Sequence, residues 1–258
     1  MQPFALVTGA SKGLGKSIAL QLAARKIPVL LVARSEHALA ALAQEIRGKH
    51  QVASDFLAID LSINNAPAQV LDWCQTKGYP VSILINNAGY GLWGRFDALS
   101  LDAQMDMLRL NMLSLTRFTH LFLPELKRHS QAYILNVAST AAYQAVPTLT
   151  LYAASKSFVL SFSRGLAFEL KGSPVSVTCL CPGPVNTFFT ERAGMTDTIK
   201  KTAEKFGMEA DTVARIGLTA MFAKRKEVVP GFSNQLAAFF VPLFPKSFIE
   251  RIASSVYK

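Results

Sequence analysis

Cysteine and histidine are scarce in this chain, which has three cysteines and four histidines among 258 residues. Cys74, Cys179 and Cys181 show no metal-ligand spacing, and too few histidines accompany them to complete a site, so no metal is expected. So few cysteines, in an odd number, are typical of a reducing compartment, and we expect a cytoplasmic protein. Cys179 and Cys181 alternate on the apolar run 175–181. This pattern favours two thiols on one side of a buried strand, and a redox pair is the alternative.

Long hydrophobic runs are also absent. The strongest one, Leu236–Phe244, contains a proline and is far shorter than the roughly 20 residues that a membrane-spanning helix needs. We therefore expect no transmembrane anchor. The first strand is expected within five residues of the start, which leaves no room for the charged and apolar regions of a signal peptide.

Acidic residues are in deficit: 17 of them stand against 27 lysines and arginines, which gives a net charge of +10. The basic residues are spread along the chain, with short clusters only at 200–201 and 224–226, so no nucleic-acid partner is expected. The positive electrostatic potential of the chain would attract a phosphorylated cofactor, an acidic acyl-carrier partner or an anionic membrane surface. A basic surface without a specific partner is the favoured interpretation.

What the chain does contain is a regular alternation of short apolar runs and helical patterns. Continuous apolar runs are typical of parallel strands covered on both faces, and the alternation implies right-handed crossovers. The pattern predicts an α/β fold, a single-domain Rossmann-type doubly wound parallel sheet of about seven strands with helices on both faces and a C-terminal helical extension. The length fits one domain over residues 1–258. Strands are expected from Phe4 and at 28–33, 53–59, 81–86, 132–137, 175–180 and 227–229.

Two segments depart from this alternation. Residues 184–226 begin irregularly and continue with Phe188, Phe189 and a charged stretch before a helix from about Glu209. We expect a substrate-binding lid there. Residues 232–258 form the extension, which is expected to end in an amphipathic helix. Packing of its apolar face on the domain is favoured, and contact with a partner subunit or a membrane surface is the alternative.

The beginning of the chain reads as a strand, a glycine-rich turn and a helix. Gly9, Gly13 and Gly15 would let the backbone turn tightly and approach a pyrophosphate, whose charge would then lie at the positive end of the helix. A glycine trio can also be a purely structural turn. Its place as the first turn of an alternating α/β pattern favours dinucleotide binding.

Tyr152 and Lys156 lie one turn apart on a predicted long helix, so they share a face. A phenol has an unperturbed pKa of roughly 10, and a fixed neighbouring cation favours the phenolate and lowers that pKa. The pair therefore indicates a proton donor for a carbonyl oxygen. The same spacing, taken alone, also occurs in amphipathic surface helices.

The chain also carries a set of motifs in a fixed order: Thr8-Gly-x-x-x-Gly-x-Gly15, Asn86-Asn-Ala-Gly89, Asn111, Ser139, Tyr152, Lys156 and Pro182-Gly183. In order and spacing, these motifs resemble the short-chain dehydrogenase/reductase superfamily over residues 4 to about 231. Within it, the chain resembles the bacterial branch related to long-chain 3-oxoacyl reductases and hydroxysteroid dehydrogenases, because it continues past the last expected strand.

The resemblance implies four catalytic residues. Tyr152 would be the general acid in reduction, and Ser139 would orient and polarise the carbonyl. Lys156 would bind the ribose and act as the electrostatic partner of Tyr152. Asn111, in a helix expected over 102–126, would hold a water that relays protons to Lys156, although an Asn within a helix can also merely bend it.

The predicted cofactor is NADP(H). The second strand ends at Ala33-Arg34, so the carboxylate that binds the ribose hydroxyls of NAD is missing there and a guanidinium follows. Arg34 and Lys12 could both reach a 2′-phosphate. Glu36 complicates this prediction, but Ser35 before it is a plausible helix cap, and Glu36 is then a carboxylate in the first helical turn.

The resemblance also implies the rest of the cofactor site. Asp60 and Leu61 would contact the adenine, Asn86, Ala88 and Gly89 would line the floor, and Thr187 would hold the nicotinamide amide. The full predicted set is Gly9, Ser11, Lys12, Gly13, Leu14, Gly15, Arg34, Asp60, Leu61, Asn87, Ala88, Gly89, Tyr152, Lys156, Pro182, Gly183, Val185 and Thr187.

The segments expected at the pocket mouth are apolar or aromatic: 90–94, 140–143 and 188–189. They suggest a hydrophobic carbonyl or alcohol as the substrate.

The resemblance implies homo-oligomers through the helices that contain Asn111 and Tyr152, with a dimer preferred over a tetramer. Two alternatives stay open: a cofactor-binding regulatory protein without turnover, and a peripheral membrane protein that uses the tail.

Overall fold

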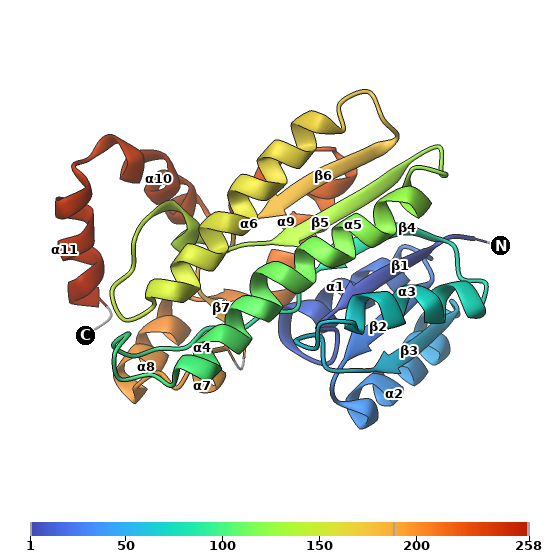
Figure 1. Ribbon diagram of the computed structural model, residues 1–258, viewed down its shortest axis with the longest axis horizontal. Helices are drawn as coiled ribbons and strands as arrows, with labels where there is room; N and C mark the ends of the chain where they lie inside the picture. The colour runs from blue at the N-terminus through green and yellow to red at the C-terminus, as the bar shows by residue number, and fades with distance from the viewer. Residues whose placement is uncertain (1, 188, 257–258) are drawn as a thin grey trace.

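Seven parallel strands form the central sheet of the computed structural model, which describes residues 2–187 and 189–256. Their order is β3-β2-β1-β4-β5-β6-β9 (Figure 1), and each neighbouring pair is parallel. The bounds are Phe4–Thr8 (β1), Val29–Ala33 (β2), Ser54–Ala58 (β3), Val81–Asn86 (β4), Ala132–Val137 (β5), Val175–Leu180 (β6) and Glu227–Val228 (β9). The predicted doubly wound sheet is confirmed.

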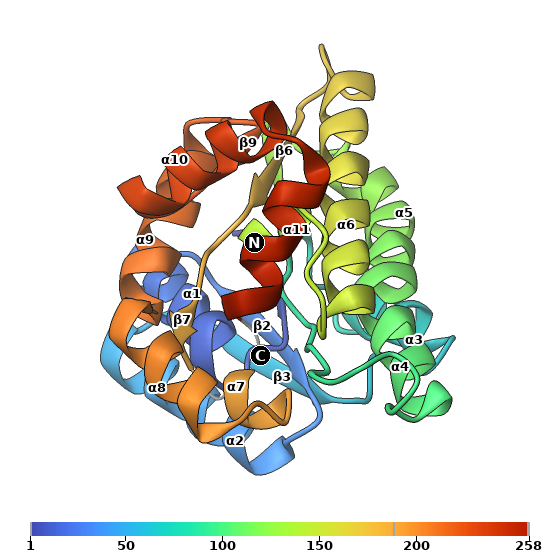
Figure 2. The same cartoon turned by 90° about the vertical axis from the view of Figure 1, so that its left-hand side faces the viewer.

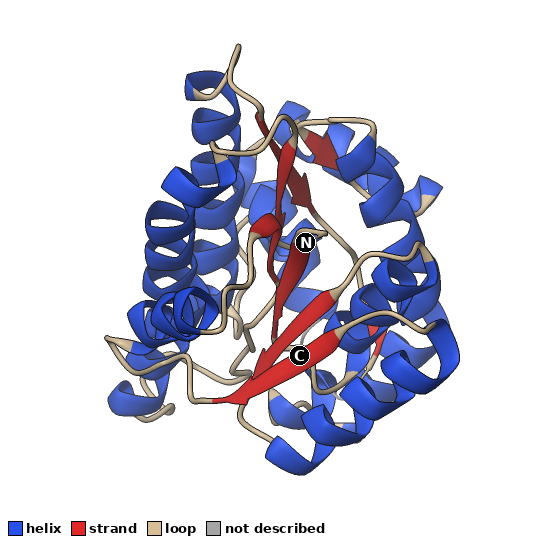
Figure 3. Cartoon of the chain, turned by 90° about the vertical axis from the view of Figure 1, so that its right-hand side faces the viewer, coloured by secondary structure: helices blue, strands red, loops and turns tan. Residues whose placement is uncertain are grey.

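Helices cover both faces of this sheet (Figures 2 and 3). One face packs against α1 (Gly13–Ala24), α2 (Glu36–Glu45) and α9 (Ala210–Phe222). The other packs against α3 (Ala66–Thr76), α5 (Leu115–Leu126) and α6 (Thr150–Glu169). Every residue of β1, β2 and β4 is buried, which is why these strands are mostly apolar and show no regular alternation.

A polar network lies within this apolar core. Asn136 on β5 accepts from Asn86 Nδ2 on β4 at 2.8 Å and donates to Ser163 Oγ on α6 at 2.9 Å. Asn86 Nδ2 also donates to Thr119 Oγ1 on α5 at 3.1 Å. The network therefore fixes α5 and α6 against the two central strands, and these are the helices that flank the site.

The helix expected over 102–126 is interrupted. It consists of α4 (Leu101–Leu108), a π-helical segment at Arg109–Ser114 and α5. Asn111 lies in the π-helical segment and is buried. Single π-turns within α-helices are frequently found at functional sites, and no residue pattern in the sequence marks this one.

The segment 184–226 has two parts. The first contains β7 (Val185–Asn186), α7 (Phe189–Arg192), α8 (Asp197–Phe206) and β8 (Met208–Glu209), and β7 pairs with β8 in a small second sheet. The second part is α9, which buries Val213, Leu218 and Met221 in the core beside the sheet. A lid, which remains our proposal for this segment, would therefore be confined to the part before α9.

The tail forms α10 (Phe232–Phe240), a 3₁₀ turn (Val241–Leu243) and α11 (Lys246–Val256) at the end of the molecule opposite the N-terminus (Figure 1). The favoured expectation is that its apolar face packs on the domain, and that face consists of Phe248, Ile249, Ile252 and Val256. Phe248 is half exposed, and the side chains of Ile252 and Val256 lie outside what the structure describes. Among its described side chains only Ala253 is buried, and several aromatic rings are exposed. No helix in residues 2–187 and 189–256 is long and apolar enough to span a membrane.

The substitution Asn136→Ala tests the polar network. It removes two hydrogen bonds from a site with no exposed surface, so we expect it to lower the free energy of unfolding by about 2 kcal/mol or more. The control is Ser176→Ala on the neighbouring strand β6, where the hydroxyl makes only a 3.4 Å contact with the Ala132 carbonyl. Urea unfolding measures both changes, and equal stability of the two variants would contradict the role of the network.

Candidate active site

A cavity of about 700 Å³ opens at the carboxyl ends of the sheet strands. Loops that follow β1, β2, β3, β4, β5 and β6 contribute to its wall, as expected of a doubly wound sheet. All residues of the predicted cofactor set line this cavity, and so does Ser139. Asn111 is the only predicted catalytic residue that does not line it.

The glycine-rich turn is built for close backbone approach. A Cβ atom on Gly15 would lie 2.2 Å from the Gly9 carbonyl oxygen, which no side chain could tolerate. Gly9 itself has a φ of +66°, a conformation that favours glycine. Asn87 Nδ2 donates to the carbonyls of Thr8 and Gly9 and fixes the turn to the end of β4. The turn leads directly into the N-terminus of α1, so its form suits a pyrophosphate.

Lys156 and Tyr152 are both buried on α6 and both line the cavity. Lys156 Nζ donates to the Val137 carbonyl oxygen at 2.9 Å and lies 5.8 Å from the centroid of the Tyr152 ring. Burial lowers the pKa of Lys156 to about 8, although the nearby thiols of Cys179 and Cys181 act in the opposite direction. The amine thus titrates near neutral pH, unlike an exposed lysine.

Ser139 follows β5 and begins a 3₁₀ turn at Thr140–Tyr143, where its Oγ accepts from the Ala141 N–H at 3.1 Å. That bond fixes the hydroxyl while its proton stays available. Because β5 and α6 pack together, Ser139, Tyr152 and Lys156 reach the same cavity from two elements.

Asn111 does not line the cavity but bonds to Tyr90, which does. Its amide brackets the backbone of Tyr90, donating to the Tyr90 carbonyl at 2.9 Å and accepting from the Tyr90 N–H at 3.1 Å. The same Nδ2 donates to Ser155 Oγ on α6 at 3.1 Å. Both ends of the side chain are therefore engaged, so it positions the loop after β4 against α6. The role in a proton relay stays a prediction.

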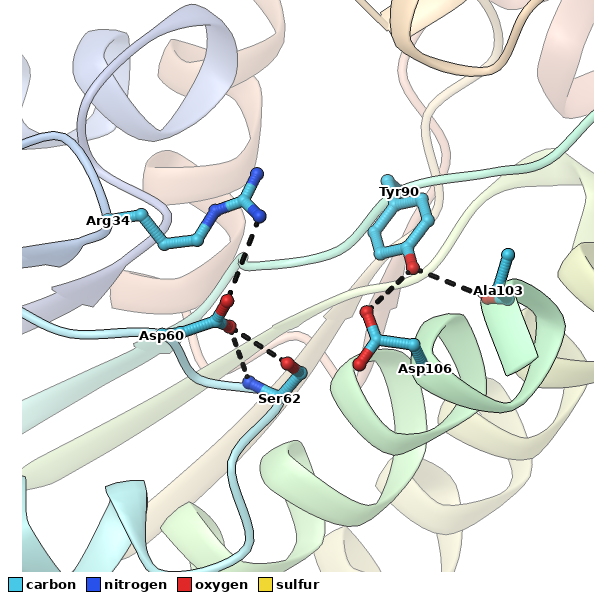
Figure 4. A network of polar contacts seen from close by, with 6 residues as sticks. All are labelled: Arg34, Asp60, Ser62, Tyr90, Ala103 and Asp106. Atoms are coloured by element: carbon cyan, nitrogen blue, oxygen red, sulfur yellow. Dashed lines mark hydrogen bonds and ion pairs between the residues drawn. The ribbon is translucent and has the colours of Figure 1, made fainter.

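The end of the cavity beside β2 and β3 carries paired charges (Figure 4). Arg34 Nη1 lies 3.8 Å from Asp60 Oδ2, and Ser62 donates to Asp60 Oδ1 through both its N–H and its Oγ at 2.9 Å. Burial acts to raise the pKa of Asp60, but the bonds from Ser62 and the charge of Arg34 outweigh it and the pKa is lowered. Asp60 is thus a fixed anion at the end of β3.

Several expected neighbours lie elsewhere. Asn86 does not line the cavity, because its amide is used in the core network. Tyr143 turns away and donates to Glu227 Oε1 at 2.5 Å. Ser35 precedes α2 as predicted, but its side chain makes no capping bond. Phe188 lies outside the described residues.

Sequence reasoning missed other residues that line the cavity. Arg192, from α7, was hidden in a charged segment, and Asp106 on α4 has no motif around it. The apolar wall also includes Leu149, Met195 and Ile199. Only spatial convergence identifies these residues, because they come from elements far apart in the sequence.

Comparison with known proteins assigns the family. The model of the short chain dehydrogenase family matches residues 3–198. The chain belongs to this family. It is 36% identical over 190 residues to the very-long-chain 3-oxoacyl-CoA reductase of Anas platyrhynchos, covering 71% of this chain and 60% of that protein. It is 33% identical over 186 residues to hydroxysteroid dehydrogenase-like protein 1 of Gallus gallus, covering 71% of this chain and 56% of that protein.

The chain is also similar to a solved structure. The short-chain dehydrogenase from Sphingobium yanoikuyae in complex with NADPH is 29% identical, with 92% of each chain covered and a TM-score of 0.83. The predicted membership and the similarity to 3-oxoacyl reductases and hydroxysteroid dehydrogenases are confirmed. The match spans less than two thirds of the length of the two curated relatives named above.

The buried amine of Lys156 predicts a pH dependence. With a pKa of about 8, it is charged below that pH and becomes neutral as the pH rises through it. If the charged form supports catalysis, kcat/KM for carbonyl reduction falls above about pH 8, because kcat/KM reports the groups of the free enzyme. The guanidinium of the variant Lys156→Arg stays charged throughout this pH range. The decline of kcat/KM in this variant should therefore begin at a higher pH than in the wild type. A wild-type profile that stays flat through pH 8 and beyond would contradict this role.

Proposed function

We propose that this protein is an NADP(H)-dependent oxidoreductase that interconverts a hydrophobic ketone and a secondary alcohol, with Tyr152 as the general acid and base. The observation that carries the proposal is the placement of Tyr152, Ser139 and a buried Lys156 on the wall of the cavity that the glycine-rich turn also borders. The close backbone approach at Gly15 fits a dinucleotide there.

The chemistry follows from what these side chains can do. A carbonyl oxygen gains negative charge as its carbon is reduced, and donors held near it stabilise that charge. Ser139 donates a hydrogen bond to this oxygen, and Tyr152 transfers its phenolic proton to it. Lys156 favours the resulting phenolate through its charge. When bound, the nicotinamide supplies the hydride.

The preference for NADP(H) rests on the charges beside β2. Ala33 lines the cavity where a ribose-binding carboxylate would be needed for NAD, and Arg34 and Lys12 line it too. Glu36 lies outside the cavity lining, at the start of α2, where a carboxylate is favourable to the helix dipole. A 2′-phosphate would meet cations on this wall.

The substrate class rests on the apolar end of the cavity. Leu149, Phe189, Met195 and Ile199 line it, and the ring of Phe189 lies 5.3 Å from that of Tyr152. A wall of this kind favours a hydrophobic carbonyl compound such as an oxoacyl chain or a steroid. The names of the relatives, a 3-oxoacyl-CoA reductase and a hydroxysteroid dehydrogenase-like protein, agree with this class.

Substitution of Tyr152 tests the proposal. Tyr152→Phe removes only the hydroxyl, so we expect about a 10²–10⁴-fold loss of turnover with an unchanged dissociation constant for NADPH. Ser139→Ala should lose less, because it removes one stabilising donor and leaves the acid in place. Steady-state kinetics with NADPH and NADH and a direct binding titration measure these effects. Full turnover by Tyr152→Phe would refute the acid role, and a clear wild-type preference for NADH would refute the cofactor assignment.

Homo-oligomerisation belongs to the proposal, with a dimer preferred over a tetramer. The helices that contain Asn111 and Tyr152 carry exposed apolar side chains, among them Met105, Leu113 and Phe168. Such side chains suit a helix-to-helix contact between copies of this chain. We also propose a cytoplasmic location, which the three free cysteines support.

The exposed tail favours a second candidate, a reductase that also binds the membrane surface. Phe232, Phe239 and Phe248 are exposed by half or more on α10 and α11, and the chain carries a net charge of +10. Exposed aromatic rings and positive charge together suit an anionic bilayer.

Sedimentation with liposomes tests this candidate. The full chain should sediment with anionic vesicles and much less with neutral ones, and the variant Phe239→Ser/Phe248→Ser should stay in the supernatant. The control is Phe96→Ser, an exposed ring outside the tail. If the wild-type chain does not sediment with vesicles and the variant Phe239→Ser/Phe248→Ser converts a dimer into monomers, the tail is a contact between subunits. The membrane candidate is then wrong.

A further inference from the structure

Arg192 is a cation of the cavity wall to which neither the family motifs nor the proposed function gives a role. It is the last residue of α7, in the segment between β6 and α9 that covers the cavity. Its guanidinium carbon lies 4.2 Å from the centroid of the Tyr90 ring. That distance is within the range of a cation–π contact, which holds a charged group on a neutral surface without neutralising it.

The ring beneath Arg192 is rigidly placed. Tyr90 Oη donates to Asp106 Oδ2 at 3.0 Å and lies 3.4 Å from the Ala103 carbonyl (Figure 4). Its backbone is bracketed by the Asn111 amide. Burial, together with the bond to Asp106, raises the pKa of Tyr90 to about 12, so the phenol stays neutral. Tyr90 thus belongs to the loop after β4 and is fixed in place by its bond to Asp106 on α4.

Arg192 and Arg34 line the same cavity and interact unfavourably with each other. Burial, followed by the charge of Arg34, lowers the pKa of Arg192, while Tyr90, Asp60 and Asp106 act in the opposite direction. Asp60 is paired with Arg34, and Asp106 is bonded to Tyr90, so both nearby carboxylates already have partners. The two arginines line one cavity from different elements, the residue after β2 and the end of α7.

We propose that Arg192 is a specificity-determining ligand of the 2′-phosphate of NADP(H), which it binds opposite Arg34. A dianionic phosphate between the two guanidiniums converts their repulsion into two charge-assisted contacts, and each guanidinium can bind it in bidentate fashion. Because Arg192 belongs to α7 and Arg34 directly follows the sheet strand β2, the same phosphate would join the segment between β6 and α9 to the body of the protein. In the absence of the phosphate, the guanidinium of Arg192 stays on the Tyr90 ring at the cavity wall. On binding, its contact with the phosphate replaces its contact with the ring.

This inference rests on the proposed preference for NADP(H), and it differs from that preference in what it predicts. The preference alone requires only Lys12, in the glycine-rich turn, and Arg34, directly after β2. The inference adds that a residue about 160 positions later in the chain distinguishes the two dinucleotides. An arginine that bound the shared pyrophosphate instead would affect both dinucleotides equally.

The test compares Arg192→Met with Arg95→Met by isothermal titration. Methionine keeps the aliphatic length and removes the charge. Arg95 is an exposed arginine paired with Asp97 and does not line the cavity, so Arg95→Met controls for the loss of one positive charge. Each protein is titrated with NADPH, with NADH and with adenosine 2′,5′-bisphosphate. Thermal melting of each variant checks that the fold is retained.

For Arg192→Met we expect the dissociation constants for NADPH and for adenosine 2′,5′-bisphosphate to rise about 10- to 100-fold, as for the loss of a bond to a charged group. The NADH constant should change by less than about threefold, and Arg95→Met should bind all three ligands as the wild type does. Arg192→Lys should recover part of the loss. Equal weakening of NADPH and NADH, or no weakening of NADPH, would overturn the inference while the wild-type preference for NADPH stands. A wild-type protein that binds NADH as tightly as NADPH would instead refute the proposed cofactor assignment.

Discussion

The burial of one charged amine is the constraint on which the rest of the site depends. Lys156 lies inside the protein, where an unpaired ammonium is strongly disfavoured. Its bond to the Val137 carbonyl satisfies one donor, and the Tyr152 ring lies nearby on the same helix. This geometry requires α6 to sit against the end of β5 in one register. The core network of Asn86, Asn136 and Ser163 fixes that same register several residues away, so packing and chemistry are joined through one helix.

The two sides of the cavity are lined in different ways, one by backbone and the other by side chains. On the nucleotide side, the protein approaches with its backbone, because Gly9 and Gly15 leave no room for a Cβ and Asn87 ties the turn to β4. On the reacting side, it approaches with the side chain of Ser139, which follows β5, and with those of Tyr152 and Lys156 on α6. The segment between β6 and α9 closes the remaining side and brings Phe189 next to Tyr152 and Arg192 next to Tyr90. A segment that touches both ends of the cavity can join cofactor binding to enclosure of the substrate.

Much of this could be predicted from local sequence, because continuous apolar runs fix buried parallel strands and glycine spacing fixes the turn. The predictions failed where the role of a residue depends on contacts with elements that are distant in the sequence. Asn86 and Asn87 are adjacent and chemically identical, yet one serves the core and the other the turn. Tyr143 was expected at the pocket and is bound by Glu227, a residue from the last strand of the sheet. The π-helical segment around Asn111 and the position of Arg192 depend on contacts between distant elements, and no pattern along the chain encodes them. The tail pattern predicted an amphipathic helix correctly but could not show that its aromatic rings stay exposed.

The most direct test of the central claim follows a labelled hydrogen. The purified protein is incubated with NADPH deuterated at the reactive carbon of the nicotinamide and with a panel of ketones of increasing chain length and ring number, and the products are analysed by mass spectrometry. We predict that a hydrophobic ketone yields a secondary alcohol with one deuterium on the carbinol carbon, with loss of one NADPH per alcohol formed. Tight binding of NADPH without deuterated alcohol from any ketone would contradict the account and leave a nucleotide-binding protein without this catalysis.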